Sequence, residues 1–310
     1  MKILLASPIH DDALRQLKER YEVATAYDAP EDVLKERIRG CSVLVFRSGV
    51  NISADVMAQA PGLQLAVRAG SGCENIDLDY VRRHGIELVR VPGPGAKAVA
   101  ELAFALMLNL ARNVRPADQQ LRQGRWAKHR MTGYLLTGKV LGIVGAGNIG
   151  TRVGELGAAW GMSAVGCVEH YSLERAADYA LRGIHLTTFD EVLSTADFVT
   201  LHVPRTPATV RMIGRDAIGR MKPGAFLVNL ARGGVVDERA VGEALGSGRL
   251  RGAALDVHEA EGEGRISPLA GLDNVILTPH IGAGTYDSQR ELGEIVVDRI
   301  HAFETAVVAR

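Results

Sequence analysis

Short apolar runs alternate with amphipathic stretches through the first 91 residues of the chain. The apolar runs have the length of buried strands, and in the stretches between them apolar residues share a helical face, as Leu14 and Leu17 do. This alternation predicts a parallel sheet with helices on both faces. The expected strands are residues 3–6, 22–26, 43–47, 63–67 and 86–91, and the expected helices are residues 12–21, 30–39, 53–60 and 78–84.

The stretch Pro92-Gly93-Pro94-Gly95 interrupts this alternation and predicts a loop or hinge, because both residue types break regular structure. Residues 98–113 follow and are apolar on nearly every side, which is typical of a helix buried all round, here between two domains. The polar, basic residues 115–130 predict a connecting segment.

The alternation of strands and helices resumes at Lys139 and predicts a second parallel sheet, of the Rossmann type. Because this sheet is complete before the last amphipathic helix, residues 284–306, that helix is expected to pack on the first domain. The sequence therefore predicts an α/β protein with two Rossmann-like, doubly wound parallel-sheet domains and a cleft between them. The first domain is discontinuous, residues 1–97 with 285–310, and the second is residues 98–284. The strands expected in the second sheet are residues 140–145, 163–168, 183–187, 197–203, 225–230, 252–257 and 275–279.

Composition and charge narrow the class of protein. A hydrophobic content of 47% and a charged content of 23% are typical of a soluble globular chain, and 36 basic residues balance 36 acidic ones. This balance gives no net field toward nucleic acid or an anionic membrane. The N-terminal apolar run stops at Pro8, no window approaches the roughly 20 apolar residues of a membrane span, and the scattered cysteines form neither a disulfide framework nor a metal site. We therefore expect a cytoplasmic protein with no metal, nucleic-acid or membrane partner.

A glycine motif, Gly145-Ala146-Gly147-Asn148-Ile149-Gly150, follows the first strand of the second sheet and opens a helical pattern. Gly145 permits the tight turn, Gly147 lets the backbone approach a pyrophosphate, and Gly150 lets the helix pack closely on the strand. The phosphates would lie at the helix N-terminus, where Asn148 and Ile149 supply N–H groups. An ordinary tight turn is the alternative, but the flanking strand and helix favour dinucleotide binding.

A carboxylate about 20 residues beyond such a motif commonly binds the ribose hydroxyls of NAD. Glu169 stands at about that distance from Gly150, and its charge would repel the 2′-phosphate of NADP. We therefore expect NAD as the cofactor. An exposed loop glutamate is the alternative, and the nearby Arg175 leaves NADP open.

Reactive residue types follow three later strands, at the carboxyl ends where ligands bind in open α/β sheets. Arg232 lies in the first of these loops, several carboxylates lie in residues 255–261, and His280 lies in the third. His280 differs from the other histidines because it follows Thr278-Pro279 at a strand end that faces the expected cofactor. We expect an arginine, a carboxylate and a histidine to converge on one crevice.

Several of these runs resemble the D-isomer-specific 2-hydroxyacid dehydrogenases, and the similarity extends over essentially the whole chain. The resemblance implies an NAD-dependent oxidoreductase that interconverts a D-2-hydroxy acid and its 2-oxo acid. It assigns the catalytic roles to Arg232, Glu261 and His280, substrate binding to the first, flavodoxin-like domain, and a homodimer formed through the cofactor domain. The runs that carry it are residues 142–150, 221–237, 254–257 with Glu261, 278–282, 68–77 and 99–101.

The chemistry of this family suits the three side chains. A histidine titrates near neutral pH, so His280 can take the hydroxyl proton or return it in the reverse direction. An ionised Glu261 would favour the imidazolium and fix its orientation. Arg232 offers paired donors to the substrate carboxylate or to the developing carbonyl oxygen.

The resemblance also implies further ligand contacts in each domain. Backbone N–H groups of Ser71 and Gly72 are expected near the substrate carboxylate, with Arg232 and His280. Arg47, Ser48 and Arg68 would suit a second anionic group, although arginines at strand ends are often only solvated or ion-paired. The remaining cofactor contacts are expected from His202, Val203, Pro204, Thr209, Ala231, Arg232, Asp256, His280 and Gly282.

These basic positions are similar to the phosphoglycerate dehydrogenase branch, in a short form without a regulatory domain after residue 310. A glyoxylate or hydroxypyruvate reductase is the alternative, and an NAD-sensing, corepressor-like binding protein is an alternative of another class. The chain departs from the family pattern at His258 and Gly262, where Phe and Pro are common, at Val168, where aspartate is usual, and after Gly93, where Asn is common. These departures leave the substrate and the NAD preference open.

Overall fold

The computed structural model describes residues 1–70 and 72–308, and its contacts divide the chain into two compact units. Unit 1 comprises Met1–Gly95 with Ala283–Arg310, and unit 2 comprises Ala96–Gly282. Each unit contains one sheet, and all the paired strands of both sheets are parallel. The predicted class, two doubly wound parallel α/β domains, is confirmed.

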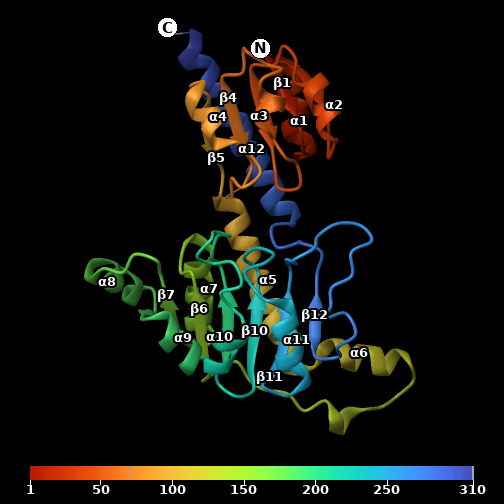
Figure 1. Ribbon diagram of the computed structural model, residues 1–310, viewed down its shortest axis with the longest axis vertical. Coiled ribbons are helices and arrows are strands. Elements are labelled where there is room, and N and C mark those ends of the chain that lie inside the picture. The colour runs from red at the N-terminus through yellow and green to blue at the C-terminus, as the bar shows by residue number, and fades with distance from the viewer. Residues whose placement is uncertain (71, 309–310) are drawn as a thin grey trace. The chain divides into compact units, whose positions relative to one another are not determined.

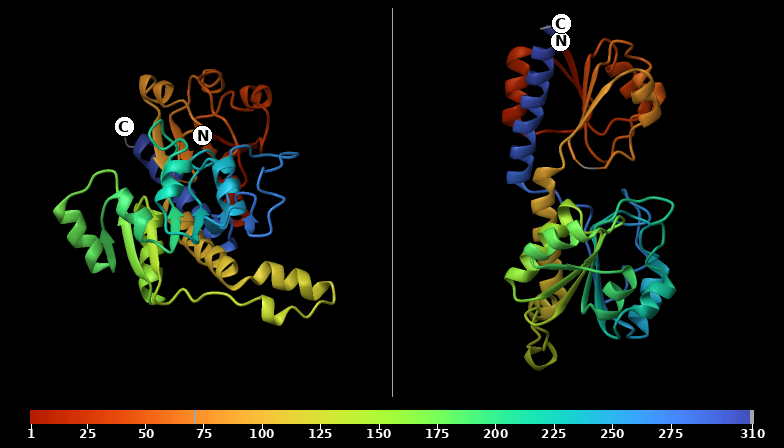
Figure 2. Two further views of the ribbon diagram at one scale, coloured as in Figure 1. Left: turned by 60° about the horizontal axis from the view of Figure 1, so that its bottom comes forward. Right: turned by 90° about the vertical axis from the view of Figure 1, so that its left-hand side faces the viewer.

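The sheet of unit 1 has five strands in the order β2-β1-β3-β4-β5. Figure 1 labels β1, β4 and β5 of this sheet. Alternate strand residues are buried on opposite faces: Ile3 and Leu5 pack against α1 and α12, whereas Leu4 and Ala6 share a core with α2, α3 and α4. Helices α1 and α12 lie side by side on one face, with α2, α3 and α4 on the other (Figure 2). The elements are β1 (Lys2–Leu5), α1 (Asp11–Arg20), β2 (Glu22–Thr25), α2 (Glu31–Arg37), β3 (Val43–Phe46), α3 (Ala54–Met57), β4 (Leu65–Arg68), α4 (Leu78–Arg83), β5 (Glu87–Arg90) and α12 (Tyr286–Val308).

The sheet of unit 2 has seven strands in the order β12-β11-β10-β9-β6-β7-β8. The chain begins this sheet at β6, adds β7 and β8 on one side, and then continues from β9 on the other side. The strand order therefore reverses between β6 and β9, which is where open parallel sheets bind ligands. The elements are β6 (Val140–Val144), α7 (Asn148–Ala159), β7 (Ser163–Cys167), α8 (Leu173–Leu181), β8 (Ile184–Leu186), α9 (Phe189–Thr195), β9 (Phe198–Leu201), α10 (Arg215–Arg220), β10 (Ala225–Asn229), α11 (Glu238–Gly246), β11 (Leu250–Leu255) and β12 (Val275–Leu277).

The helix α5 (Gly93–Arg112) differs from its prediction at both its start and its surface. It begins inside the Pro92-Gly93-Pro94-Gly95 stretch, because a proline in the first turn lacks only an N–H that has no partner within the helix. It is not buried all round, since Lys97, Glu101 and Ala105 are exposed at a spacing of four residues and form one solvent-facing stripe.

Among the described helices, α5 alone has the length and mean hydropathy, 1.2, of a membrane span, contrary to the expectation that no window would reach it. The structure buries 56% of that window, and a buried core helix has the same length and composition.

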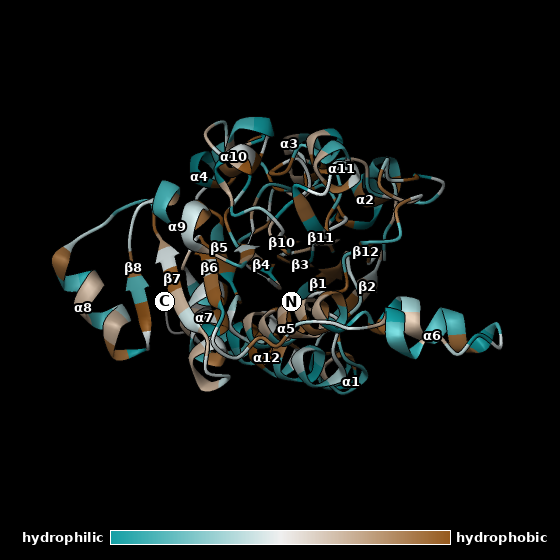
Figure 3. Ribbon diagram, turned by 90° about the horizontal axis from the view of Figure 1, so that it is seen from below, coloured by the Kyte–Doolittle hydropathy of each residue, from teal (hydrophilic) through white to brown (hydrophobic). Residues whose placement is uncertain are grey.

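The predicted connecting segment contains a further helix, α6 (Val114–Arg122), and a short 3-10 turn, η1 (Lys128–Arg130). Asn113 separates α5 from α6 because it adopts a left-handed conformation with φ of 53°, which asparagine tolerates. Helix α6 has no buried residue, and it is largely polar whereas β6 is apolar (Figure 3).

Candidate active site

The glycine motif connects β6 to α7, and two of its glycines are required by packing. Gly145 has φ of 90°, and a Cβ atom there would lie 2.7 Å from the Val203 side chain and 2.9 Å from the His202 backbone. A Cβ atom at Gly150 would overlap the carbonyl oxygen of Gly145. At Gly147, by contrast, a Cβ atom would meet nothing within 4 Å. The motif is therefore closed toward the protein and open on the side where a ligand would lie.

The N-terminus of α7 is suited to an anion. Gly147 is its N-cap residue, and no side chain caps the helix. The first N–H groups of a helix, here those of Asn148, Ile149 and Gly150, have no intrahelical partner and favour negative charge. With the open face at Gly147, these residues fit the pyrophosphate of a dinucleotide.

The end of β7 gives less support to the predicted ribose contact. The Cys167 carbonyl oxygen accepts hydrogen bonds from the N–H groups of Gly145 and Ala146, at 3.1 and 3.0 Å, so the glycine motif is held at this strand end. Glu169 lies in the bend beyond it and is exposed. Arg175, the residue that left NADP open, donates to the His170 carbonyl oxygen at 2.8 Å.

The loop after β9 lies beside the glycine motif, at the point where the strand order reverses. His202 Nε2 is 2.9 Å from Thr200 Oγ1, while its Nδ1 is buried without a hydrogen-bond partner in the structure. Burial lowers the pKa of His202 to about 3, so the ring is neutral. Further along, Thr209 Oγ1 donates to the Pro204 carbonyl oxygen at 2.6 Å and closes the turn. Val203, Pro204 and Thr209 thus belong to one fixed loop.

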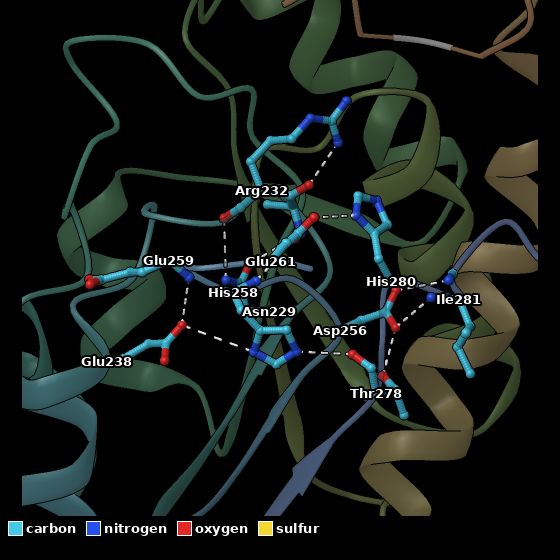
Figure 4. Close-up of polar contacts among 12 residues, drawn as sticks. Asn229, Arg232, Glu238, Asp256, His258, Glu259, Glu261, Thr278, His280 and Ile281 are labelled. Atoms are coloured by element: carbon cyan, nitrogen blue, oxygen red, sulfur yellow. Dashed lines mark hydrogen bonds and ion pairs between the residues drawn. The ribbon is translucent and has the colours of Figure 1, made fainter. Parts of the chain in front are cut away.

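His280 and Glu261, predicted from the family resemblance to act together, are in contact. His280 Nδ1 lies 3.0 Å from Glu261 Oε2, and the two side chains are 39% and 42% exposed (Figure 4). The hydrogen bond with Glu261 raises the pKa of His280, and burial and the charge of Arg232 oppose it to a smaller extent. The same bond lowers the pKa of Glu261. The pair therefore favours a carboxylate beside an imidazolium.

Asp256 fixes the turn that carries His280. Its side chain is 2% exposed, and its oxygens accept hydrogen bonds from Thr278 Oγ1 at 2.6 Å, Ile281 N at 2.9 Å and Gly282 N at 2.8 Å (Figure 4). The backbone of His280, at φ of 55°, also donates to the Asp256 carbonyl oxygen at 2.8 Å. Asp256 and Gly282, both predicted cofactor residues, are thus parts of the support for His280.

Arg232 lies in the loop after β10. Asn229 Oδ1 accepts the N–H of Ala231 at 3.1 Å, and the Arg232 guanidinium donates to the Ala231 carbonyl oxygen at 2.7 Å. Its charge lowers the pKa of His280, so the two side chains are within electrostatic reach of each other. The three predicted catalytic residues are therefore gathered at one edge of one sheet.

The predicted substrate residues lie in unit 1, and the structure gives them different surroundings. Arg68 is 5% exposed and donates to the carbonyl oxygens of Gly72, at 2.6 Å, and Ala69, at 3.2 Å. Its guanidinium therefore contacts the backbone of Gly72, whose N–H group was expected near the substrate carboxylate. Ser48 is exposed, and Ser71 lies outside the described residues.

Arg47 is half-buried beside a cavity of about 80 Å³ that Pro8, His10 and Gln289 also line. Burial lowers the pKa of Arg47.

The sequence did not single out one buried acid near this site. Glu238 is 2% exposed, although it begins α11, and it accepts hydrogen bonds from Glu259 N at 2.7 Å and Ser267 Oγ at 2.9 Å. An acid in the first turn of a helix is common at surfaces, so nothing in the pattern signals burial here.

Known proteins resemble this chain over most of its length. Residues 104–282, more than half of the chain, match the model of the NAD binding domain of the D-isomer specific 2-hydroxyacid dehydrogenases. The chain is 42% identical over 301 residues to a D-3-phosphoglycerate dehydrogenase of Methanocaldococcus jannaschii, which covers 97% of this chain and 57% of that protein. It is 38% identical over 304 residues to a hydroxypyruvate reductase of Thermotoga maritima, which covers 96% of this chain and 97% of that protein.

A solved structure with a similar fold is a D-lactate dehydrogenase from Aquifex aeolicus complexed with NAD and lactic acid. It superposes with a TM-score of 0.85 and 28% sequence identity, over 100% of this chain and 97% of that one. The chain spans little more than half the length of the phosphoglycerate dehydrogenase and nearly the whole length of the hydroxypyruvate reductase. The matched domain contains the glycine motif, Arg232, Glu261 and His280. The chain therefore belongs to the D-isomer specific 2-hydroxyacid dehydrogenase family, with unit 2 as its NAD-binding domain.

Proposed function

We propose that this protein is an NAD-dependent oxidoreductase that interconverts a D-2-hydroxy acid and its 2-oxo acid. The observation that carries the proposal is the contact of His280 with Glu261, 3.0 Å apart at the carboxyl edge of the sheet whose glycine motif fits a dinucleotide. NAD, when bound, accepts the hydride from C2 of the hydroxy acid, and NADH returns it to the 2-oxo acid.

His280 handles the proton that accompanies the hydride. In the oxidation, neutral His280 takes the proton of the C2 hydroxyl at Nε2, because Nδ1 faces Glu261. In the reduction, the imidazolium donates that proton to the oxygen of the 2-oxo acid. Glu261 raises the pKa of His280 and so keeps more of the ring protonated near neutral pH. Arg232 provides paired donors for the carboxylate of the acid.

We further propose that the substrate carries a second anionic group, as D-3-phosphoglycerate does. Arg47 is half-buried, burial lowers its pKa, and no carboxylate is paired with it among residues 1–70 and 72–308. A guanidinium in such surroundings is stabilised by binding an anion. The phosphoglycerate dehydrogenase relative supports this choice, and the hydroxypyruvate reductase relative supports an alternative substrate without phosphate.

An absorbance assay of NADH and NADPH oxidation with a panel of 2-oxo acids tests both proposals. The panel contains 3-phosphohydroxypyruvate, hydroxypyruvate, glyoxylate and pyruvate. We expect the largest kcat/KM with NADH and 3-phosphohydroxypyruvate, and Arg47→Gln should raise the KM of this acid more than that of hydroxypyruvate. A preference for hydroxypyruvate or glyoxylate would support the reductase alternative. Binding of NADH with no turnover of any acid would support a binding protein of the corepressor type.

We also propose a homodimer formed through the arm of unit 2 that contains α6 and η1. Large apolar side chains lie exposed along this arm, with Leu121 60%, Trp126 81% and Leu135 68% exposed, which is typical of an interaction surface. The balanced charge and the free cysteines support a cytoplasmic location. Sedimentation should give a dimer, and Trp126→Glu should shift it to a monomer. A wild-type monomer would remove this proposal and leave the activity proposal intact.

A further inference from the structure

A second carboxylate and histidine, Glu238 and His258, lie beneath the pair formed by Glu261 and His280 (Figure 4). The His258 side chain is 15% exposed and that of Glu238 is 3% exposed, with His258 Nδ1 4.0 Å from Glu238 Oε1. This nitrogen is buried and has no hydrogen-bond partner among residues 1–70 and 72–308. Neither residue has a role in the proton transfer described above, yet both are withdrawn from solvent. Burying polar groups of this kind costs free energy that hydrogen bonds must offset, so the contacts of both residues matter.

The Nε2 atom of His258 and its backbone N–H connect separate segments of the site. His258 Nε2 lies 3.0 Å from the Thr278 carbonyl oxygen, and because a carbonyl oxygen only accepts, Nε2 carries the proton and donates. The backbone N–H of His258 donates to Glu261 Oε1 at 3.1 Å. Glu261 therefore uses one oxygen toward His258 and the other toward His280. His258 thus touches the acid itself and the turn that carries the histidine.

Glu238 holds the same loop from the side of α11. Its Oε1 accepts a hydrogen bond from the N–H of Glu259, and its Oε2 accepts one from the hydroxyl of Ser267. One carboxylate therefore holds both ends of the loop from residue 259 to residue 267. The loop after β10 joins this arrangement, because a Cβ atom at Gly233 would overlap the His258 carbonyl oxygen. The segments that bear Arg232, Glu261 and His280 thus meet at His258 and Glu238.

Little else restrains the loop between these contacts. Residues 259–266 are exposed in an unbroken run. Arg211 Nε lies 3.9 Å from Glu259 Oε1, with the arginine 63% exposed. The charges of Asp256 and Arg232 act on His280 itself. An exposed ion pair contributes little, so the buried contacts determine where Glu261 lies.

We propose that His258 and Glu238 are positioning residues that hold Glu261 against His280 and thereby keep the imidazolium available for reduction. The inference rests on the proposed function, because it concerns the same acid–base pair. Its consequence is specific: loss of the contacts should lower the pKa of His280 by releasing Glu261, even though neither residue touches His280.

The test is a titration of the His280 ring by NMR, in the full-length protein without cofactor and with labelled histidine. The signal is assigned by its loss in His280→Asn. Glu261→Gln gives the reference shift of the His280 midpoint to lower pH. Glu238→Ala should shift the midpoint in the same direction, to a value between wild type and Glu261→Gln. Glu243→Gln is the matched control, because Glu243 lies on α11 with its side chain 46% exposed and paired with Arg215, and it should leave the midpoint unchanged.

Two substitutions at His258 separate the hydrogen bond from simple packing. His258→Phe keeps a ring but removes both ring nitrogens, while the backbone N–H to Glu261 remains. It should shift the His280 midpoint to lower pH. His258→Gln places an amide N–H near the position of Nε2, so it should restore much of the wild-type midpoint. If Glu238→Ala does not fold, these two variants still test whether the buried contacts set the titration midpoint of His280.

A His280 midpoint that stays at the wild-type value in Glu238→Ala or in His258→Phe would overturn the proposal, as would equal shifts in His258→Phe and His258→Gln. In combination with Glu261→Gln, His258→Phe should add no further shift, and an additive shift would count against it. Because the titration needs no turnover, its result stands apart from the activity assay. If the protein were inactive but showed the expected shifts, the positioning roles of His258 and Glu238 would stand and the proposed function would be wrong.

Discussion

The glycine motif after β6 and the segment from Asp256 to Gly282 lie at the same edge of one sheet, but different forces shape them. The glycine motif is defined by what a side chain would strike: the carbonyl oxygen of Gly145 behind Gly150, and open space in front of Gly147. The second segment is defined by hydrogen bonds between side chains and backbone, centred on Asp256 and His258. A side chain at Gly145 or Gly150 would therefore strike fixed atoms, whereas the second segment can lose its hydrogen bonds one at a time.

The largest effect should come from the proton-transfer group itself. His280→Asn should lower kcat for reduction by about 10²–10⁴-fold, which is the usual contribution of a general acid or base. Asparagine tolerates the left-handed backbone of this position, so the variant should fold. Steady-state kinetics measure the loss, and fluorescence titration should show unchanged NADH binding because the glycine motif is intact. A kcat within a few-fold of the wild-type value would show that His280 is not the proton-transfer group.

A pair of glycine substitutions should separate packing from ligand binding in the first region. Gly150→Ala should destabilise the fold by about 1–3 kcal/mol, as overpacking usually does, because its Cβ meets fixed backbone. Gly147→Ala has room and an ordinary φ of −80°, so it should keep its Tm and instead weaken NADH binding by about tenfold or more, or about 1.4 kcal/mol. Thermal melts and NADH titrations measure the two effects. If Gly150→Ala and Gly147→Ala both lowered the Tm, or both weakened NADH binding at an unchanged Tm, the separation of packing from ligand binding would be wrong.

The smallest effect should come from the exposed acid beyond β7. Glu169→Ala should change the ratio of kcat/KM for NADH and NADPH by less than about fivefold, because an exposed charge interacts by about 0.2–1 kcal/mol. Kinetics with both cofactors measure the ratio. A larger swing toward NADPH would mean that Glu169 approaches the ribose more closely than its exposed position indicates.

The two regions also differ in how far the sequence predicted them. The spacing of the glycines between an apolar strand pattern and a helical pattern was enough to predict the first region, because that spacing is itself the local signal. The placement of Arg232 and His280 at strand ends followed from the parallel order of the sheet. The choice of Glu261 among the nearby carboxylates needed the family resemblance, since an irregular loop with several acids has no periodic pattern.

Other features depend on tertiary packing that no local pattern encodes. Glu238 resembles an ordinary first-turn acid, and only the fold brings Glu259 and Ser267 onto it. Arg68 stays a predicted substrate residue, and only the fold shows that its guanidinium also donates to the backbone of Ala69 and Gly72. The start of α5 at Gly93 was missed because Pro and Gly near a helix N-terminus are compatible with either a loop or a first turn.

The central claim is that Glu261 sets the protonation of His280, and the pH dependence of NADH oxidation by a 2-oxo acid tests it most directly. Contact with Glu261 raises the pKa of His280, and reduction needs the imidazolium, so the reduction rate should fall as pH rises through that pKa. In Glu261→Gln the pKa of His280 falls, and the alkaline limb of the profile should move to lower pH while turnover at acidic pH survives in part. The acid limb for oxidation should move in the same direction, because oxidation needs the neutral ring. Limbs that keep their wild-type positions in Glu261→Gln would contradict the account.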